Sequence, residues 1–268
     1  MRLTFLLDND VCWNLNTLNK SISLLLKKNF IIDGIWIFPQ KLSHLSGFNI
    51  KLWYFKTFGF FNFLKLSIFY CLVLLKNLSK KKNKNQGFNF KDLSKKYNFK
   101  INYAENPNNR KVSNFIKKNK TDIIIILTNH ILKKKIINSP KLGVINKHSS
   151  LLPALRGLFP YFWAKIYNLN NGITFHLVSD KIDDGRILFQ KKPKKKFSSM
   201  ISFYYYVFNK YPLFLFESLK SIKKKTKFKF YYKSSYYSLP NKKNYKEFKK
   251  KGGNIILIKD IYNISKYF

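Results

Sequence analysis

Alternating apolar segments and polar breaks predict a layered α/β domain. Residues 2–7 run apolar into Asp8-Asn9-Asp10, which predicts a strand followed by a helix start. Residues 15–28 place apolar side chains at helical spacing, and residues 31–38 predict a second strand. Residues 122–127 include four consecutive isoleucines, a run typical of a central parallel strand that is buried on both faces. This order predicts a doubly wound, mostly parallel sheet with a small C-terminal appendage.

The length of 268 residues suits one large α/β domain with an addition at its end. We predict a main domain over residues 1–195 with a helical insert at about 51–78, and a helical and short-strand extension over 196–268. Within the extension we expect a long helix that breaks at Pro212, because proline disrupts helix interiors. Residues 254–258 are a last possible strand.

Residues 57–75 are apolar enough that they could form a helix in or on a membrane. They are nineteen mostly apolar residues with Lys65 in the middle. A transmembrane helix needs about 20 apolar residues, and a central lysine costs roughly 2.5–3.5 kcal/mol. The pattern favours a buried or interface helix, with a membrane-surface helix and a true span as alternatives. We expect no stable membrane insertion.

The formal net charge is +40, with only 12 carboxylates against 52 Lys and Arg residues. Because the excess is spread along the chain and accompanied by many Asn, Ile, Phe and Tyr residues, it is typical of an AT-rich genome. Selection for anionic partners is the alternative interpretation. The lysine-rich stretch at 79–85 predicts a solvated loop.

The cysteines and the first residues of the chain indicate in which cellular compartment the protein is found. Cys12 and Cys71 are too few and too far apart for a disulfide framework or a zinc site, so we expect no metal. Asp8 and Asp10 interrupt what would be the apolar core of a signal peptide. Both features favour a cytoplasmic location.

The segment from Gly143 to Gly157, GVINKHSSLLPALRG, concentrates groups that can do chemistry. At the end of a predicted strand, Asn146 and His148 are two residues apart and therefore project to the same side. Ligands of open α/β sheets bind outside the carboxyl ends of the strands, so this pair is expected to face a cleft. An amide and an imidazole together can donate hydrogen bonds to a developing oxyanion.

Four sequence pieces in this order resemble the folate-dependent formyltransferases, a family that includes glycinamide ribonucleotide, methionyl-tRNA and amino-sugar formyltransferases. The pieces are NKHSSLLP from Asn146, RG at Arg156, GITFH from Gly172 and DDG from Asp183. The resemblance is firm over about 122–190. It implies transfer of a formyl group from N10-formyltetrahydrofolate to a primary amine, without a metal.

The resemblance also implies roles for individual residues. Asn146, His148 and Asp183 map onto the family's catalytic asparagine, histidine and aspartate, whereas Asp184 is the weaker candidate. His176 is expected to support its strand. The residues expected to bind the formyl donor are Thr128, Asn129, His130, Ile131, Leu132 and Asp180. Those expected to bind the acceptor are Ser149, Ser150, Arg156 and Gly157.

The chain also departs from the family's subgroups. The place of the glycine-rich loop of glycinamide ribonucleotide enzymes holds DNDVCWN, and neither the Gly-Thr-Pro step nor a convincing barrel of methionyl-tRNA enzymes is present. By elimination we expect the acceptor to be a phosphorylated or nucleotide-linked amine, on an amino-sugar nucleotide. Methionyl-tRNA is the alternative acceptor. A non-catalytic, basic protein that binds nucleic acid or a membrane surface on the same fold is the alternative of another class.

Overall fold

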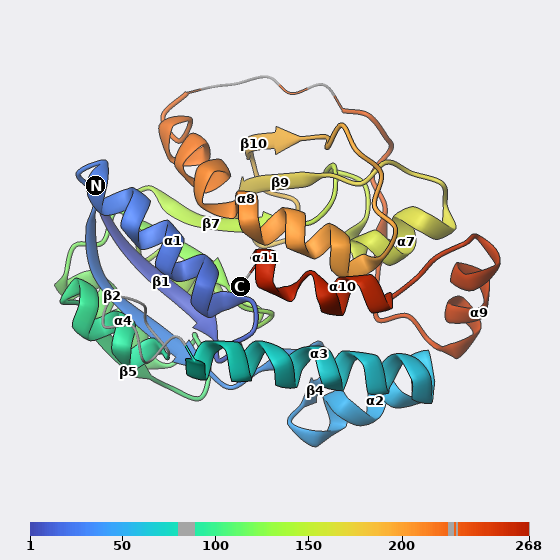
Figure 1. Ribbon diagram of the computed structural model, residues 1–268. Coiled ribbons are helices and arrows are strands. Elements are labelled where there is room, and N and C mark those ends of the chain that lie inside the picture. Colours follow the sequence, from blue (N-terminus) through green and yellow to red (C-terminus); the bar gives the residue numbers. More distant parts are fainter. Residues whose placement is uncertain (80–88, 225–227, 229, 268) are drawn as a thin grey trace.

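The computed structural model describes residues 1–79, 89–224, 228 and 230–267 (Figure 1), so most of the loop predicted at 79–85 lies outside the described residues. The strands are β1 (Arg2–Asp8), β2 (Ile31–Phe38), β3 (Lys41–Leu42), β4 (Leu45–Ser46), β5 (Lys100–Tyr103), β6 (Ile123–Leu127), β7 (Gly143–His148), β8 (Arg156–Gly157), β9 (Ile173–Leu177), β10 (Ile187–Lys191) and β11 (Tyr236–Tyr237). The helices are α1 (Asn14–Lys27), α2 (Phe48–Phe58), α3 (Phe60–Ser79), α4 (Phe90–Tyr97), α5 (Arg110–Lys118), α6 (Lys134–Ile137), α7 (Pro160–Ile166), α8 (Met200–Lys220), α9 (Lys242–Lys250), α10 (Ile258–Tyr262) and α11 (Ile264–Tyr267).

A seven-stranded sheet in the order β10-β9-β7-β6-β1-β2-β5 organises the molecule. The five strands from β7 to β5 are parallel, and β9 runs antiparallel to both β7 and β10. The isoleucine-rich β6 lies in the middle, as predicted, because its side chains are buried on both faces. The predicted doubly wound, mostly parallel sheet is confirmed.

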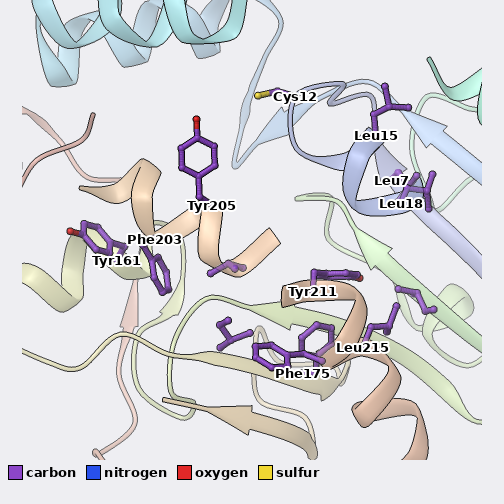
Figure 2. Close-up of a cluster of buried hydrophobic side chains, with 14 of the residues drawn as sticks. Leu7, Cys12, Leu15, Leu18, Tyr161, Phe175, Phe203, Tyr205, Tyr211 and Leu215 are labelled. Atoms are coloured by element: carbon purple, nitrogen blue, oxygen red, sulfur yellow. The ribbon is translucent and has the colours of Figure 1, made fainter. Parts of the chain in front are cut away.

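Apolar side chains fill both faces of the sheet. One core lies between the sheet and the layer that contains α1 and α8, and a smaller core lies under α5 and α6 on the other face. In the larger core Tyr211 and Leu215 of α8 approach Phe175 of β9 (Figure 2), and the Phe175 and Tyr211 rings are 5.2 Å apart between centroids. The packing of α8 therefore fixes β9 in place within the sheet.

The C-terminal residues differ from the prediction in three ways. Because α8 packs against α1, β9 and β10, the extension completes the main core rather than forming an appendage. The predicted break at Pro212 is wrong, since α8 runs through this residue. Burial of neighbouring side chains such as Tyr211 compensates for the lost hydrogen bond. Residues 254–258 form no strand, although Asn254 O and Ile255 O accept the first N–H groups of α8.

The predicted insert is a pair of helices, α2 and α3, separated at Gly59, whose φ of 79° no helix can continue through. The prediction for this segment was a buried or interface helix; the buried form is wrong for α3, in which only Phe69, Val73 and Asn77 are buried. Among the described residues, α3 is the one helix long and apolar enough to cross a membrane by length and composition.

Asp10 holds the turn that leads into α1, at the helix start predicted from Asp8-Asn9-Asp10. Its Oδ1 accepts the N–H groups of Cys12 and Trp13 at 2.9 and 3.1 Å. Burial raises the pKa of Asp10 to about 6 despite these two bonds. Stability therefore falls as the pH rises from the ordinary value of 3.8 to about 6, and the full loss persists above it, because the unfolded chain releases the same proton at the lower value.

Replacing Asp10 with asparagine should stabilise the protein by up to about 3 kcal/mol at pH 8, and by about half as much at pH 5. The amide oxygen still accepts both N–H groups, whereas the buried charge is gone. Urea unfolding at both pH values measures this difference. Asp180→Asn, at an exposed carboxylate, is the control and should show no such pH dependence; an equal effect of Asp10→Asn at both pH values would contradict the explanation.

Candidate active site

The carboxylate of Asp183 lies at the centre of a cluster of four side chains: Asn146, His148, His176 and Asp183 itself. Asn146 Nδ2 donates to its Oδ1 at 3.2 Å, and His148 Nδ1 lies 3.3 Å from its Oδ2. Gly157 N–H donates to the same Oδ2 at 2.9 Å. The structure thus brings together the three residues predicted to be catalytic, from the end of β7 and the loop between β9 and β10.

His176 completes the cluster from the neighbouring strand. The antiparallel register places it directly opposite Asn146, and its Nε2 lies 3.4 Å from Asp183 Oδ1. Its Nδ1 donates to Leu177 O at 2.9 Å, which fixes the ring. The prediction of a strand-supporting role was therefore incomplete, because His176 also contacts the central carboxylate.

Opposing effects set the charge state of the cluster. Burial alone would raise the pKa of Asp183, but His148, His176 and the Gly157 N–H lower it well below its ordinary value. Burial lowers the pKa of His148, and the attraction of Asp183 offsets this only in part. Near neutral pH the cluster therefore holds an ionised Asp183 beside a neutral His148.

The hydrogen bonds of His148 fix where it can take up a proton. Its Nε2 lies 2.7 Å from Leu155 O, a contact that requires a hydrogen on Nε2 because a carbonyl can only accept. In the neutral ring Nδ1 then carries the lone pair and faces Asp183. A proton taken up at Nδ1 would lie against the carboxylate.

Two glycines allow the loops to meet. A side chain at Gly185 would place Cβ 1.7 Å from Leu177 O, and one at Gly157 would place it 2.2 Å from Tyr237 O. Gly157 also has a φ of 93°, and Asp183 adopts a left-handed φ of 50°, which Asp and Asn tolerate better than most residues. The RG and DDG pieces are thus required by backbone geometry as well as by chemistry.

Replacing Gly157 with alanine should lower the free energy of unfolding by about 2 kcal/mol or more, because its Cβ meets the backbone of β11. Gly252→Ala is the control: its φ is 71°, but the nearest atom to a new Cβ is Lys165 Nζ at 4.0 Å. It should cost only about 1–2 kcal/mol of backbone strain. Urea unfolding measures both variants, and an equal loss in the two would remove the steric explanation.

The residues predicted to bind the acceptor divide into two groups. Ser149 and Ser150 are buried: Lys147 Nζ lies 3.2 Å from Ser149 Oγ, and Ser150 Oγ donates to Ala154 O at 2.7 Å. Their hydroxyls hold the loop, and their contact with the acceptor stays a prediction. Arg156 is partly exposed, and its Nη1 lies 2.9 Å from Asp184 Oδ1. Gly157 uses its N–H to hold Asp183.

The residues predicted to bind the formyl donor lie on two adjacent loops. Thr128 to Leu132 follow β6, and Asp180 follows β9. Lys134 Nζ, at the start of α6, lies 3.2 Å from Asp180 Oδ2 and so links the two loops. Within the described part of the chain, the N–H groups of Ile131, Leu132 and Asp180 make no hydrogen bond, which leaves them available to a ligand.

Asp8, at the end of β1, orders the first of these loops. It accepts hydrogen bonds from Thr128 Oγ1 and from Asn129 N, the latter at 3.1 Å. His130 Nε2 contacts Pro39 O at 2.9 Å, so its ring points toward β2 rather than into the cluster. Burial raises the pKa of Asp8, with Thr128 and Asn129 opposing the shift.

Among the residues that the structure describes, no group of three or more His, Cys, Asp or Glu side chains could hold a metal ion.

Comparison with known proteins relates part of the chain to a known family. The sequence model of the formyl transferase family matches residues 75–196. Residues 75–196 belong to the formyl transferase family. A methionyl-tRNA formyltransferase of Wigglesworthia glossinidia brevipalpis is 41% identical over 104 residues, which cover 38% of this chain and 33% of that protein.

Solved structures share the fold of the formyl transferase segment and its surroundings. A sugar N-formyltransferase from Shewanella sp FDAARGOS_354 aligns with a TM-score of 0.53 at 17% identity, covering 88% of this chain and 76% of that one. A sugar 3N-formyl transferase solved in the presence of dTdp and 5-N-Formyl-THF aligns with a TM-score of 0.51 at 16% identity, covering 89% and 69%. Both likenesses show the fold.

The formyl transferase segment contains every residue predicted for the site. The sequence undervalued His176 of the cluster and missed Asp8, which orders the loop after β6. The role of His176 could have been predicted from its place in the GITFH strand, because pairing of that strand with β7 sets His176 opposite Asn146. Asp8 had a weaker signal, a carboxylate at the end of the first strand, and lies outside the matched segment.

Proposed function

We propose that this protein transfers a formyl group from N10-formyltetrahydrofolate to a primary amine. The observation that carries the proposal is the contact of Asn146 and His148 with Asp183, at 3.2 and 3.3 Å. Membership of residues 75–196 in the formyl transferase family supports it. The intact cluster favours an enzyme over a non-catalytic binding protein on the same fold.

The two loops beside the cluster fit the donor. The N–H groups of Leu132 and Asp180 are available to the polar edge of a pterin ring. Ile131 and Ile182, whose side chains are 71% and 44% exposed, offer apolar contact from either loop. When bound, N10-formyltetrahydrofolate supplies the formyl carbon that the amine attacks.

The cluster can assist the attack in two ways. Asn146 Nδ2 uses one hydrogen for Asp183 and keeps a second for the formyl oxygen as negative charge builds on it. Neutral His148 can take the proton of the attacking amine at Nδ1, where Asp183 stabilises the imidazolium that results. The same proton can then pass to the leaving nitrogen.

Our first candidate for the acceptor is the amino group of methionyl-tRNA. The relative that is 41% identical over 104 residues bears that function in its name. A chain with a net charge of +40 also attracts the phosphates of tRNA. We therefore rank this acceptor above the amino-sugar nucleotide that the sequence favoured by elimination.

An amino-sugar nucleotide remains the second candidate because of the C-terminal residues. The described part of 200–268 is mainly helical and covers the sheet, at the place where methionyl-tRNA enzymes continue into a barrel. Arg156, partly exposed beside the cluster, offers a cation for an acceptor phosphate.

The two acceptors can be separated by comparing kcat/KM for methionyl-tRNA and for a panel of amino-sugar nucleotides with the same formyl donor. We expect methionyl-tRNA to be preferred, with an affinity that falls steeply as salt is raised. A preference for an amino-sugar nucleotide would reverse the ranking. Turnover with neither, by folded protein, would refute both acceptors.

A further inference from the structure

The outward face of α3 is a continuous apolar stripe. It consists of long side chains that recur every three or four residues and therefore share one side of the helix. Their exposed fractions run from 39% to 75%. We call this set the α3 stripe: Phe61, Leu64, Ile68, Leu72, Leu75 and Leu78. Soluble proteins rarely leave so extended an apolar surface without a partner.

The opposite side of α3 is fixed to the protein. Phe69 and Val73 are buried there, and the Phe69 ring lies 5.9 Å from that of Trp13. Asn62 Nδ2 donates to Tyr245 Oη at 2.7 Å, and Lys76 Nζ donates to Ser265 O at 2.9 Å. In Figure 1, α3 runs along the body beside α2 and below α10 and α11. The helix therefore offers one face and cannot cross a bilayer alone.

The charge of α2 and α3 indicates which kind of partner the α3 stripe binds. Residues 48–79, which form α2 and α3, contain Lys51, Lys56, Lys65 and Lys76 and no carboxylate. The whole chain carries +40. Two copies approaching through this face would bring like charges together. Nucleic acid would attract the lysines but would leave the apolar stripe unpaired. An anionic lipid surface matches both the lysines and the apolar side chains.

We propose that the α3 stripe docks the protein on the surface of an anionic lipid bilayer, with α3 lying parallel to the membrane plane. The apolar side chains enter the boundary between headgroups and acyl chains, while Lys51, Lys56 and Lys65 remain among the lipid phosphates. This inference is independent of formyl transfer, because α3 carries none of the residues of the cluster.

Vesicle flotation tests the proposal with the full chain. The wild type should float with vesicles that contain phosphatidylglycerol and remain unbound with vesicles of phosphatidylcholine alone. The double variant Leu64→Gln, Leu75→Gln should bind the anionic vesicles about tenfold more weakly or worse, since two apolar side chains no longer enter the lipid. Glutamine keeps helix propensity, so folding should be unaffected.

A second double variant, Ile31→Gln, Leu213→Gln, is the matched control. These two side chains are 51% and 48% exposed, against 43% and 58% for Leu64 and Leu75, and lie outside the stripe. The control should float like the wild type. The proposal is overturned if the wild type does not bind anionic vesicles, or if the stripe variant binds them as well as the wild type. It is also overturned if sedimentation shows a wild-type dimer that the stripe variant abolishes, because the partner is then a second copy.

Discussion

Replacing Asp183 with asparagine should lower the rate of formyl transfer by about a thousandfold or more. The change removes the charge that stabilises a proton on His148, while the amide keeps nearly the same size. Asparagine also tolerates the left-handed φ of 50° at this position, so the backbone should not move. Single-turnover kinetics with saturating donor and acceptor measures the effect.

Asp184→Asn is the matched control for this variant. Asp184 is the next residue in the same turn, but its carboxylate pairs with Arg156 rather than with a residue of the cluster. Its loss should change the rate of transfer by less than about tenfold, since exposed ion pairs contribute little. If Asp184→Asn is as damaging as Asp183→Asn, the roles of the two carboxylates are wrong.

His148→Ala should lower the rate by about a hundredfold to ten-thousandfold, because it removes the group that takes up the proton. In the wild type the same group predicts a pH effect. His148 must be neutral to accept a proton, so transfer should decline as the pH falls through its lowered pKa, below the ordinary histidine value of about 6.5. The pH dependence of single-turnover rates measures both effects.

His44→Ala serves as the control because His44 is exposed and distant in sequence from every residue of the cluster. It should leave the rate and its pH dependence unchanged. A wild-type profile that stays flat through this acidic range, or a His148→Ala variant that keeps the wild-type rate, would contradict the role of His148.

The sheet could be predicted because its signals are local. Four isoleucines in a row leave few alternatives to a central strand, and the DNDVCWN break marks the end of β1 and the start of α1. The cluster could be predicted because Asn146 and His148 share one face of β7, and because the family resemblance supplied Asp183. Only the structure shows that the three side chains meet.

The errors arose where tertiary packing outweighs local preference. Pro212 continues α8 because the helix is held by burial against β9 and β10, which no local pattern reports. The hydropathy of α3 predicted a buried or interface helix without deciding between them, because composition alone cannot distinguish a core helix from one with an exposed apolar face.

The most direct test of the proposed function follows an isotopically labelled formyl group from N10-formyltetrahydrofolate by mass spectrometry of the acceptor. With wild-type protein and methionyl-tRNA, the amino group of methionine should gain one labelled formyl group while tetrahydrofolate is released. Asp183→Asn should give almost no product over the same time. Labelled product that forms equally fast with Asp183→Asn, or no labelled amine with any acceptor tested, would contradict a formyl transfer centred on Asn146, His148 and Asp183.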